Sequence, residues 1–285
     1  MNIHYVVVSR NNYLYLSAAI NSLINSNKDN HKLIVTVVSN VDKKKLIEET
    51  SIIDSEVIEI HVLMLDGVHG YSKSLIEGID FCINNKIWDR DEIVLAGNDD
   101  ILFFNDFISN ISSIDFKDKT IYAPHIFQAN GNLQKSIFRK EYKKLDLFLR
   151  HKDGGASSIF FPNIERESLP DNIERRTVDG CLVISNNLRN LRKIFDKEIF
   201  LYYEELFFQY ISLHKDLSFL ISDRLKIMHF GGSTVTRDNL SRRLTIASKS
   251  REYVARKYLN FNAIELLFLK VVQFFERLIR NFIKF

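Results

Sequence analysis

Short apolar runs alternate with amphipathic segments over the first third of the chain. Two segments, residues 16–23 and 72–84, carry apolar side chains at helical spacing. Four runs rich in β-branched residues lie around them, at residues 3–8, 33–38, 57–65 and 92–96. Strands that are separated by helices are typical of βαβ units. The pattern therefore predicts an α/β fold with a mainly parallel sheet that is flanked by helices.

Polar residues follow three of these predicted strands at the point where each strand ends. In open α/β sheets, ligands bind beyond the carboxyl ends of the strands. The turns after the first, second and fourth strands therefore hold the first candidate binding residues. These are Ser9, Arg10, Asn11, Ser39, Asn40, Asn98, Asp99 and Asp100.

The middle of the chain has a weaker pattern. Residues 127–176 are mixed and charged, which predicts strands and loops over the sheet. Residues 177–185 are expected to form a strand next to a polar turn at Asp179 and Gly180. An aromatic-rich segment follows at residues 200–213, and we expect its second half to be helical.

The last part of the chain is expected to be helical throughout residues 240–285, as a region separate from a domain over residues 1–239. From residue 262 onward, polar residues recur every three or four positions among Leu, Ile, Val and Phe. This spacing is typical of an amphipathic helix with a wide apolar face. The polar stripe consists of Lys270, Gln273, Arg277, Arg280 and Lys284.

Charge is distributed unevenly along the chain. The net charge is +3, but residues 237–285 hold 11 Lys and Arg against 4 Asp and Glu, which leaves the remainder at −4. A basic region on an acidic body suits an anionic partner such as a membrane surface. We therefore expect the C-terminal helix to lie in the membrane interface. The alternative is that its apolar face packs on the domain or on a second subunit, as in a homodimer.

The amino-acid composition and the cysteine spacing favour a folded protein in a reducing compartment. Hydrophobic residues make up 46% of the chain, enough for a sizeable core. Cys82 and Cys181 form no CxxC pair, which suits a reducing compartment without structural disulfides or zinc. The first residues are expected to form a strand and not a signal peptide. We expect a cytoplasmic protein with peripheral contact at the inner face of the cytoplasmic membrane.

Two adjacent carboxylates, Asp99 and Asp100, end the fourth predicted strand. Such a pair is costly beside a buried strand unless positive charge lies close to it. A divalent cation that also binds a diphosphate would meet this need. The alternative is an Asx turn or a helix N-cap, because Asn and Asp favour both.

A second pair of carboxylates, Glu204 and Glu205, lies among aromatic residues. Apolar surroundings raise the pKa of a carboxyl group toward neutral pH, so this pair could supply a general base. The alternative is the solvated first turn of a helix, where Glu suits the helix dipole.

Two further segments have weaker signals. His229 is followed by two glycines and two hydroxyl residues, which would let backbone approach a phosphate; the alternative is a core histidine. Lys73 lies at the start of a predicted helix, after Gly70, where backbone N–H groups favour an anion. The alternative there is an ordinary capped helix with a surface lysine.

The order and spacing of these segments resemble the family-2 glycosyltransferases of GT-A fold, a Rossmann-like α/β fold, and especially their rhamnosyltransferase-like branch. The resemblance covers about residues 3–260. Seven segments carry it, each similar to a motif of the family and all in the family's order. They are residues 7–11, 38–42, 70–74, 98–100, 178–181, 195–205 and 229–233.

The resemblance implies a role for each candidate residue. Asp100, with Asp99 and His229, would hold Mn²⁺ or Mg²⁺ against the donor diphosphate, and Asp179 and Gly180 would face the acceptor. Glu205 stands at the position of the family's catalytic Asp, with Glu204 before it. The nucleotide would be surrounded by Ser9, Arg10, Asn11, Ser39, Lys73, Asn98 and Asp99.

Three positions depart from the family's pattern. Ser39 replaces an Asp that commonly binds the nucleobase, which leaves the nucleotide open. Glu205 replaces a shorter Asp, so that either Glu204 or Glu205 could be the base. Arg10 stands where the family has an aromatic residue.

We therefore expect an inverting glycosyltransferase that moves a sugar from a nucleoside diphosphate to a lipid-linked or oligosaccharide acceptor. O-antigen, capsule or another cell-surface polysaccharide is the expected product. One alternative is a non-catalytic, nucleotide-sugar-binding scaffold protein of the same fold. Another is a nucleotidyltransferase, although residues 9–12 lack the glycine-rich loop that such enzymes carry after the first strand. Nucleic-acid binding is not expected, because the basic charge is confined to the C-terminal region.

Overall fold

A computed structural model describes most of the chain. The described residues are 1–10, 12–29, 31–39, 43–50, 57–67, 69–88, 92–134, 143–149, 174–175, 178–230 and 240–283. Of the predicted segments, residues 127–176 therefore lie largely outside the described part.

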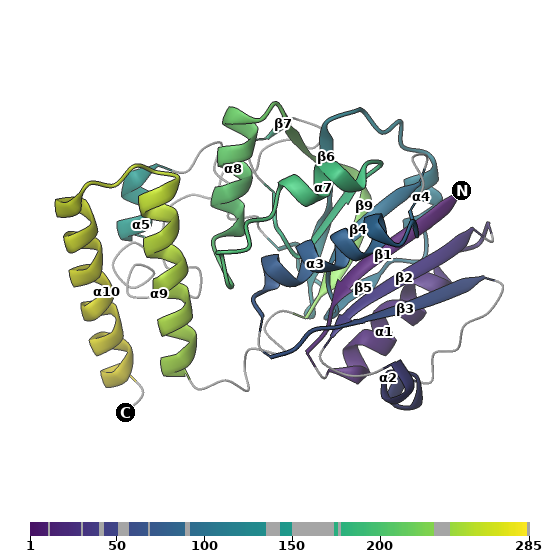
Figure 1. The fold of residues 1–285 in the computed structure, drawn as a ribbon, viewed down its shortest axis with the longest axis horizontal. Helices are drawn as coiled ribbons and strands as arrows, with labels where there is room; N and C mark the ends of the chain where they lie inside the picture. Colours follow the sequence, from purple (N-terminus) through teal and green to yellow (C-terminus); the bar gives the residue numbers. More distant parts are fainter. Residues whose placement is uncertain are drawn as a thin grey trace.

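The described strands form one mixed sheet, which lies in the right half of the molecule in Figure 1. Its first four strands are parallel, as predicted, in the order β3-β2-β1-β4. They are β1 (Asn2–Val8), β2 (Lys32–Ser39), β3 (Ile58–Met64) and β4 (Ile93–Asn98). The expected α/β fold with helices around the sheet is thus confirmed.

Beyond β4 the sheet becomes mixed and continues in the order β8-β6-β9-β5, with β7 paired to β9. These strands are β5 (Ile101–Phe103), β6 (Thr120–Gln128), β7 (Glu174–Arg175), β8 (Leu182–Ser185) and β9 (Ser218–His229). Among the described strands, β5, β7 and β8 run against the direction of the other six. The strand predicted over residues 177–185 is shorter than expected, because residues 178–181 form the turn before β8.

Helices cover both faces of this sheet. The described helices are α1 (Tyr13–Asn25), α2 (Lys43–Thr50), α3 (Tyr71–Asn84), α4 (Phe107–Ser112), α5 (Lys144–Leu149), α7 (Leu188–Lys193), α8 (Glu204–His214), α9 (Leu240–Lys257) and α10 (Ala263–Ile283). Apolar residues of α1 and α4 pack on one face, together with Tyr5 of β1. Apolar residues of α3, α7 and α8 pack on the other face, together with Val6. Adjacent residues of β1 thus point to opposite faces, and the strand is buried on both.

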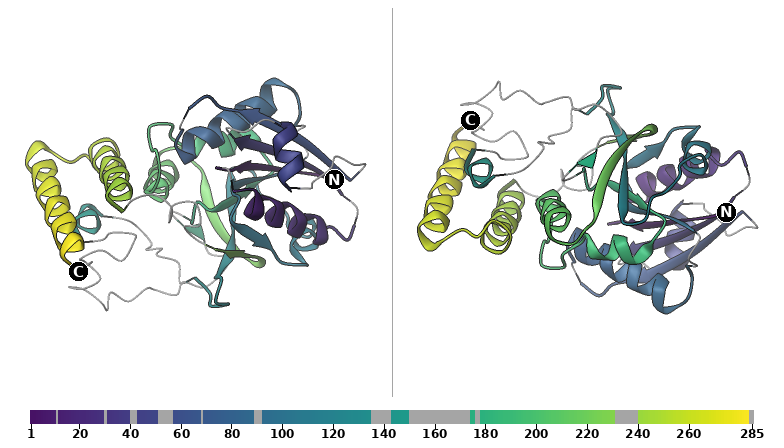
Figure 2. Two further views of the ribbon diagram at one scale, coloured as in Figure 1. Left: turned by 90° about the horizontal axis from the view of Figure 1, so that it is seen from below. Right: turned by 90° about the horizontal axis from the view of Figure 1, so that it is seen from above.

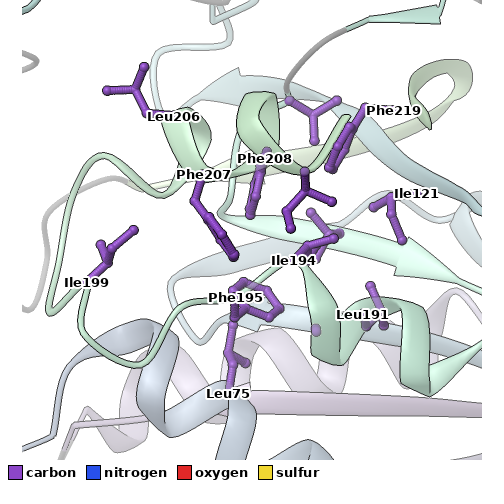
Figure 3. Close-up of a cluster of buried hydrophobic side chains, with 14 of the residues drawn as sticks. Leu75, Ile121, Leu191, Ile194, Phe195, Ile199, Leu206, Phe207, Phe208 and Phe219 are labelled. Carbon is purple, nitrogen blue, oxygen red and sulfur yellow. The ribbon is translucent and has the colours of Figure 1, made fainter. Parts of the chain in front are cut away.

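Helix α8 is held over the sheet by an aromatic cluster. Figure 3 shows Phe207 and Phe208 of α8 pointing toward Phe195 and Ile194. Phe208 also stacks on Phe219 of β9, with 5.4 Å between the ring centroids. The helix begins at Glu204, earlier than the predicted second half of residues 200–213. This packing fixes the position of the carboxylates in its first turn.

The C-terminal region is two helices and not one continuous helix. Helix α9 ends at Lys257 and α10 begins at Ala263, and Asn260 between them has a positive φ. In every view the two helices stand with α5 at the end of the molecule away from β1–β3 (Figures 1 and 2). They remain tied to the sheet domain, because Val254, Ala255 and Leu269 belong to the same apolar cluster as α8.

Asp196 connects α9 to the segment that precedes α8. Its carboxylate accepts hydrogen bonds from Tyr258 and from Tyr253 (2.7 Å), and it pairs with Lys257 at 3.2 Å. Burial by itself would raise the pKa of Asp196, but hydrogen bonds from Tyr258, the Glu198 backbone, Tyr253 and Lys257 bring that pKa below its usual value. The contact therefore stabilises the fold at neutral pH, and this contribution falls away as the pH drops through the lowered pKa.

Helix α10 packs on α9 through polar side chains as well as apolar ones. Arg251 of α9 donates to Glu276 of α10 at 2.8 Å, and both side chains are buried. Gln273 donates to the Ser248 carbonyl oxygen at 3.3 Å. Gln273, one member of the predicted polar stripe, thus faces α9. No described helix meets the length and hydropathy that a membrane-spanning helix requires.

We predict that Arg251→Met lowers the free energy of unfolding by about 3 kcal/mol or more, because it leaves the Glu276 carboxylate buried without its partner. The double variant Arg251→Met/Glu276→Leu should recover part of this loss, since it removes both charges. Urea denaturation followed by circular dichroism measures both effects. Arg277→Met, on the exposed side of α10, is the control and should stay within about 0.5 kcal/mol of the wild type. Equal effects of Arg251→Met and Arg277→Met would contradict the buried ion pair.

Candidate active site

The carboxyl ends of β1, β2 and β4 lie at one edge of the sheet and bring together the candidate residues Ser9, Ser39 and Asn98. Val8 pairs with Val38 on one side and with Asn98 on the other. The Ser9 N–H donates to the Val38 carbonyl oxygen at 3.0 Å, and this places Ser9 beside the end of β2. Ser9 and Ser39 are both buried. Two further candidates for this edge, Asn11 and Asn40, lie outside the described residues.

The turn after β4 meets the end of β9 at the same edge. Because β5 pairs with β9, Ile101 lies opposite His229, and the Phe230 N–H donates to the Asp100 carbonyl oxygen at 3.0 Å. The His229 Nε2 atom is 3.2 Å from Asp100 Oδ1 and 3.4 Å from Asn98 Nδ2. The fold thus brings together a histidine and an acidic residue that are 129 positions apart in the sequence.

Asp99 is buried at the same turn, with 4% of its surface exposed. Burial raises the pKa of this carboxyl group to about 7; the hydrogen bond from Ser9 acts against the rise, and the charge of Asp100 adds to it. Its Oδ2 atom accepts no hydrogen bond from any described residue. A buried carboxylate oxygen of this kind is satisfied by a cation or by a hydrogen-bond donor from a ligand.

Two tyrosines lie near this turn and α8; Tyr5 is buried and Tyr71 is partly buried. The Tyr5 hydroxyl donates to the Asn98 carbonyl oxygen, and burial, followed by the charges of Asp99 and Asp100, raises the pKa of Tyr5. The pKa of Tyr71 is raised by burial first, then by Cys181 and Glu204, with a smaller effect from Tyr5. Tyr5 thus contacts the end of β4, and Tyr71 contacts the turn that lies against the first turn of α8. Neither tyrosine is among the residues predicted from the sequence, although the hydroxyl of Tyr5 inside an otherwise apolar strand is a usable signal.

The turn at Asp179 and Gly180 lies against the same helix. Asp179 Oδ1 accepts from the Cys181 N–H at 3.0 Å, and Oδ2 accepts from Gln134 Nε2 at 3.1 Å, which fixes the turn. The Tyr71 hydroxyl donates to the Gly180 carbonyl oxygen at 2.6 Å. A Cβ atom on Gly180 would lie 3.8 Å from the Cβ atom of Glu204.

Glu204 and Glu205 form the first turn of α8 and are both buried. The solvated first turn that was the alternative for this pair is therefore wrong. Tyr202 and Tyr203, directly before the pair, both adopt a positive φ, at 70° and 67°. Two consecutive non-glycine residues in the left-handed region are costly, and such strain is found where a site holds the chain in place. The helix N-terminus contributes partial positive charge beside the two carboxylates.

Phe200 joins the start of α3 to the segment before α8. The Tyr71 N–H donates to the Phe200 carbonyl oxygen at 2.7 Å, and the Arg10 guanidinium carbon lies 5.9 Å from the centre of the Phe200 ring. Arg10, which replaces an aromatic residue of the family's pattern, thus has a partner in a cation–π contact. Lys73 lies half-buried in the first turn of α3, two positions after Tyr71.

The residues at the acidic turn fit a divalent cation that is shared with a diphosphate. Among the described residues, no group of three or more His, Cys, Asp or Glu side chains could hold a metal by itself. Asp100 and His229 offer one oxygen and one nitrogen ligand, and Mg²⁺ commonly takes only one or two carboxylates, with substrate phosphates and waters completing its shell. The buried and unsatisfied Asp99 Oδ2 atom adds to this fit.

Comparison with known proteins supports the fold. No family model and no curated protein matches the sequence. Structural neighbours of the chain are glycosyltransferases of GT-A type. The structure of GalNAc-T7 with UDP, GalNAc and Mn²⁺ has a TM-score of 0.56 at 11% identity, over 90% of this chain and 48% of that one. This chain thus spans about half the length of GalNAc-T7.

A second neighbour is TarS of S. aureus. Residues 1–349 of TarS in complex with UDP have a TM-score of 0.50 at 14% identity, over 94% of this chain and 70% of that one. At these identities the likeness is one of fold, and it confirms the expected GT-A architecture.

We predict that Gly70→Ala destabilises the protein by about 1–3 kcal/mol, because a Cβ atom at position 70 would lie 2.3 Å from the Phe200 carbonyl oxygen and would force backbone apart. Gly180→Ala is the matched control, since its Cβ would meet Phe208 at an ordinary 3.6 Å. The midpoint of urea denaturation should fall for Gly70→Ala and change little for Gly180→Ala. If both variants unfold at the wild-type urea concentration, the close approach of α3 to residue 200 is wrong.

Proposed function

We propose that this protein is an inverting glycosyltransferase that moves a sugar from a nucleoside diphosphate to a hydroxyl group of a glycan acceptor. One observation carries the proposal. The Asn98 N–H donates to the Cys181 carbonyl oxygen at 2.9 Å, and a Cβ atom on the neighbouring Gly180 would lie 3.8 Å from the Glu204 Cβ atom. The turn at residues 179–181 thus joins the end of β4, next to the Asp100–His229 pair, to the first turn of α8. The site therefore pairs groups suited to a diphosphate with a buried carboxylate pair suited to a proton acceptor.

The edge formed by β1, β2 and β4 is the proposed nucleotide site. Ser9, Ser39, Asn98 and Lys73 offer hydroxyl, amide and ammonium groups there, and Asn11 is proposed to join them. Asp100 and His229 would hold Mn²⁺ or Mg²⁺, which would supply positive charge for the donor phosphates. UDP in the GalNAc-T7 and TarS structures supports uracil as the base of the donor nucleotide.

One carboxylate of the Glu204–Glu205 pair is the proposed general base. It takes the proton of the acceptor hydroxyl while the hydroxyl oxygen forms a bond to the anomeric carbon. The bond from this carbon to the diphosphate oxygen breaks with its electron pair on the diphosphate, so that configuration inverts. A bound divalent cation would supply charge stabilisation for the departing diphosphate. The turn at Asp179 and Gly180, next to Glu204, is the proposed place of the acceptor.

The biological setting follows from the same proposal. The acceptor is a lipid-linked or oligosaccharide chain, and the product is a cell-surface polysaccharide such as O-antigen or capsule. The rhamnosyltransferase-like branch stays a prediction from the sequence motifs alone.

We predict that Glu204→Gln or Glu205→Gln lowers kcat for sugar transfer by about 100- to 10,000-fold, the usual contribution of a general base, while donor binding changes little. The variant with the larger loss identifies the base. Asp179→Asn is the comparison for the acceptor side and should raise KM for the acceptor more than it lowers kcat. Unchanged transfer by both glutamine variants would refute the proposed base. A wild type that binds the nucleotide but transfers no sugar would favour the non-catalytic alternative.

We predict that UDP with Mn²⁺ raises the melting temperature of the wild type more than UDP alone, because a ligand of the folded state stabilises it according to its affinity. ADP, GDP, CDP and dTDP, each with and without Mn²⁺, identify the base preference in the same thermal-shift assay. In Asp100→Asn the Mn²⁺-dependent part of the shift should be lost, whereas in Lys73→Gln it should be retained with a weaker overall shift. A shift that is equal with and without Mn²⁺ would argue against the cation at Asp100 and His229.

A further inference from the structure

Helix α10 exposes a continuous row of large apolar side chains. Their exposed fractions run from 36% for Leu278 to 78% for Ile264, and three of them are phenylalanines. The row consists of Ile264, Leu267, Phe268, Val271, Phe274, Phe275 and Leu278. We call this row the apolar face of α10. Soluble proteins rarely expose a continuous apolar surface of this kind unless it contacts a partner.

The spacing of these residues places them on one side of the helix. Each of these residues has another member of the row three or four positions away. Residues at this spacing lie on the same face of an α-helix. The opposite side is the one that contacts the protein, because Leu269, Gln273 and Glu276 are buried there. The buried Arg251–Glu276 ion pair holds this orientation at 2.8 Å. The helix is therefore fixed with its apolar face outward, except that Phe268 at the edge of this face also contacts the Phe148 ring of α5, with 5.2 Å between the ring centroids.

Basic residues border the apolar face. Lys270 and Arg277 are exposed next to it on the helix, and Lys270 lies 3.7 Å from Glu252 of α9. Residues 237–285 as a whole carry 11 basic and 4 acidic residues, whereas the rest of the chain is net acidic. Apolar side chains bordered by basic ones match the boundary between the acyl chains and the headgroups of an anionic membrane.

We propose that the apolar face of α10 binds the surface of an anionic phospholipid membrane, with the helix in the plane of the interface. A second copy of the chain is the other occupant to consider. Two copies joined through α10 would bring together two regions that each carry a charge of +7, and their repulsion opposes such a dimer. An anionic lipid surface attracts the same charge. This binding does not require sugar transfer, so its failure would leave the proposed function standing.

The test uses the full chain and two kinds of vesicle. Vesicles of phosphatidylcholine alone probe the apolar contribution, and vesicles of phosphatidylcholine mixed with phosphatidylglycerol probe the apolar and charge contributions together. Cosedimentation gives the partition coefficient for each. We expect binding to the anionic vesicles to exceed binding to the neutral ones by at least about 10-fold and to weaken as salt is added, since salt screens the basic residues.

Two variants separate the two contributions. Phe268→Ser/Phe274→Ser/Phe275→Ser should lower the partition coefficient on anionic vesicles by at least about 100-fold, because each phenylalanine that leaves water contributes roughly 10-fold. Lys270→Gln/Arg277→Gln should lower it by about 10-fold on anionic vesicles and leave neutral vesicles unchanged. The matched control is Leu14→Ser/Met64→Ser, which removes two exposed apolar residues far from α10 in sequence and should bind as the wild type does.

Three outcomes would overturn the proposal. The first is wild-type protein that stays in the supernatant with anionic vesicles. The second is a triple variant that is folded by circular dichroism and binds as tightly as the control. The third is a wild type that sediments as a dimer in the absence of lipid and becomes a monomer in the triple variant, which would assign the apolar face to a second copy. If the triple variant does not fold, the charge variant and the salt dependence of the wild type are the test. Binding to anionic vesicles that neither the charge variant nor added salt weakens would then overturn the proposal.

Discussion

Burial of four carboxyl groups around one edge of the sheet is the constraint on which the rest of this structure depends. Asp99, Asp100, Glu204 and Glu205 each have about a twentieth of their surface exposed. A buried carboxylate without compensation is costly, and several of them close together repel one another. His229, the Ser9 hydroxyl and the N-terminus of α8 compensate part of this charge. A bound cation and ligand donors would compensate the rest, and this need is the physical basis of the proposed diphosphate site.

The carboxylates keep their places because the surrounding elements leave them little freedom. Phe208 of α8 packs with Phe195 and stacks on Phe219 of β9. The two residues directly before Glu204 have left-handed backbone conformations. The start of α3 is locked to Phe200 through a glycine that no larger residue could replace without displacing backbone. Rigid packing of this kind keeps the carboxylates at a defined separation, which the proposed sugar transfer would require of its reacting groups.

The C-terminal helices are bound to the same framework, although they stand at the end of the molecule. Asp196 lies in the segment before α8 and accepts hydrogen bonds from two tyrosines of the α9 end, so the support of α8 and the position of α9 are coupled. The buried ion pair between Arg251 and Glu276 then sets which side of α10 faces outward. An amphipathic helix usually turns its apolar side toward the protein. In α10 a buried ion pair lies on the side that faces the protein, and large apolar side chains are exposed on the opposite side.

The sequence by itself determined the parallel half of the sheet, because the β-branched runs of β1, β2, β3 and β4 and the helical spacing of α1 and α3 are local patterns. It also placed Asp99, Asp100, Glu204 and Glu205 among the candidates, since paired acidic residues beside apolar runs are visible without a structure. The family resemblance also implied that His229 and Asp100 share a site, and the two side chains lie 3.2 Å apart. Only the tertiary structure decided that Tyr71 contacts Gly180 beside α8 and that Arg10 meets Phe200. It also decided that the C-terminal region is two helices with the apolar face of α10 outward. These contacts join residues far apart in sequence through strand pairing and side-chain packing, and no local periodicity encodes which distant partner a side chain will meet.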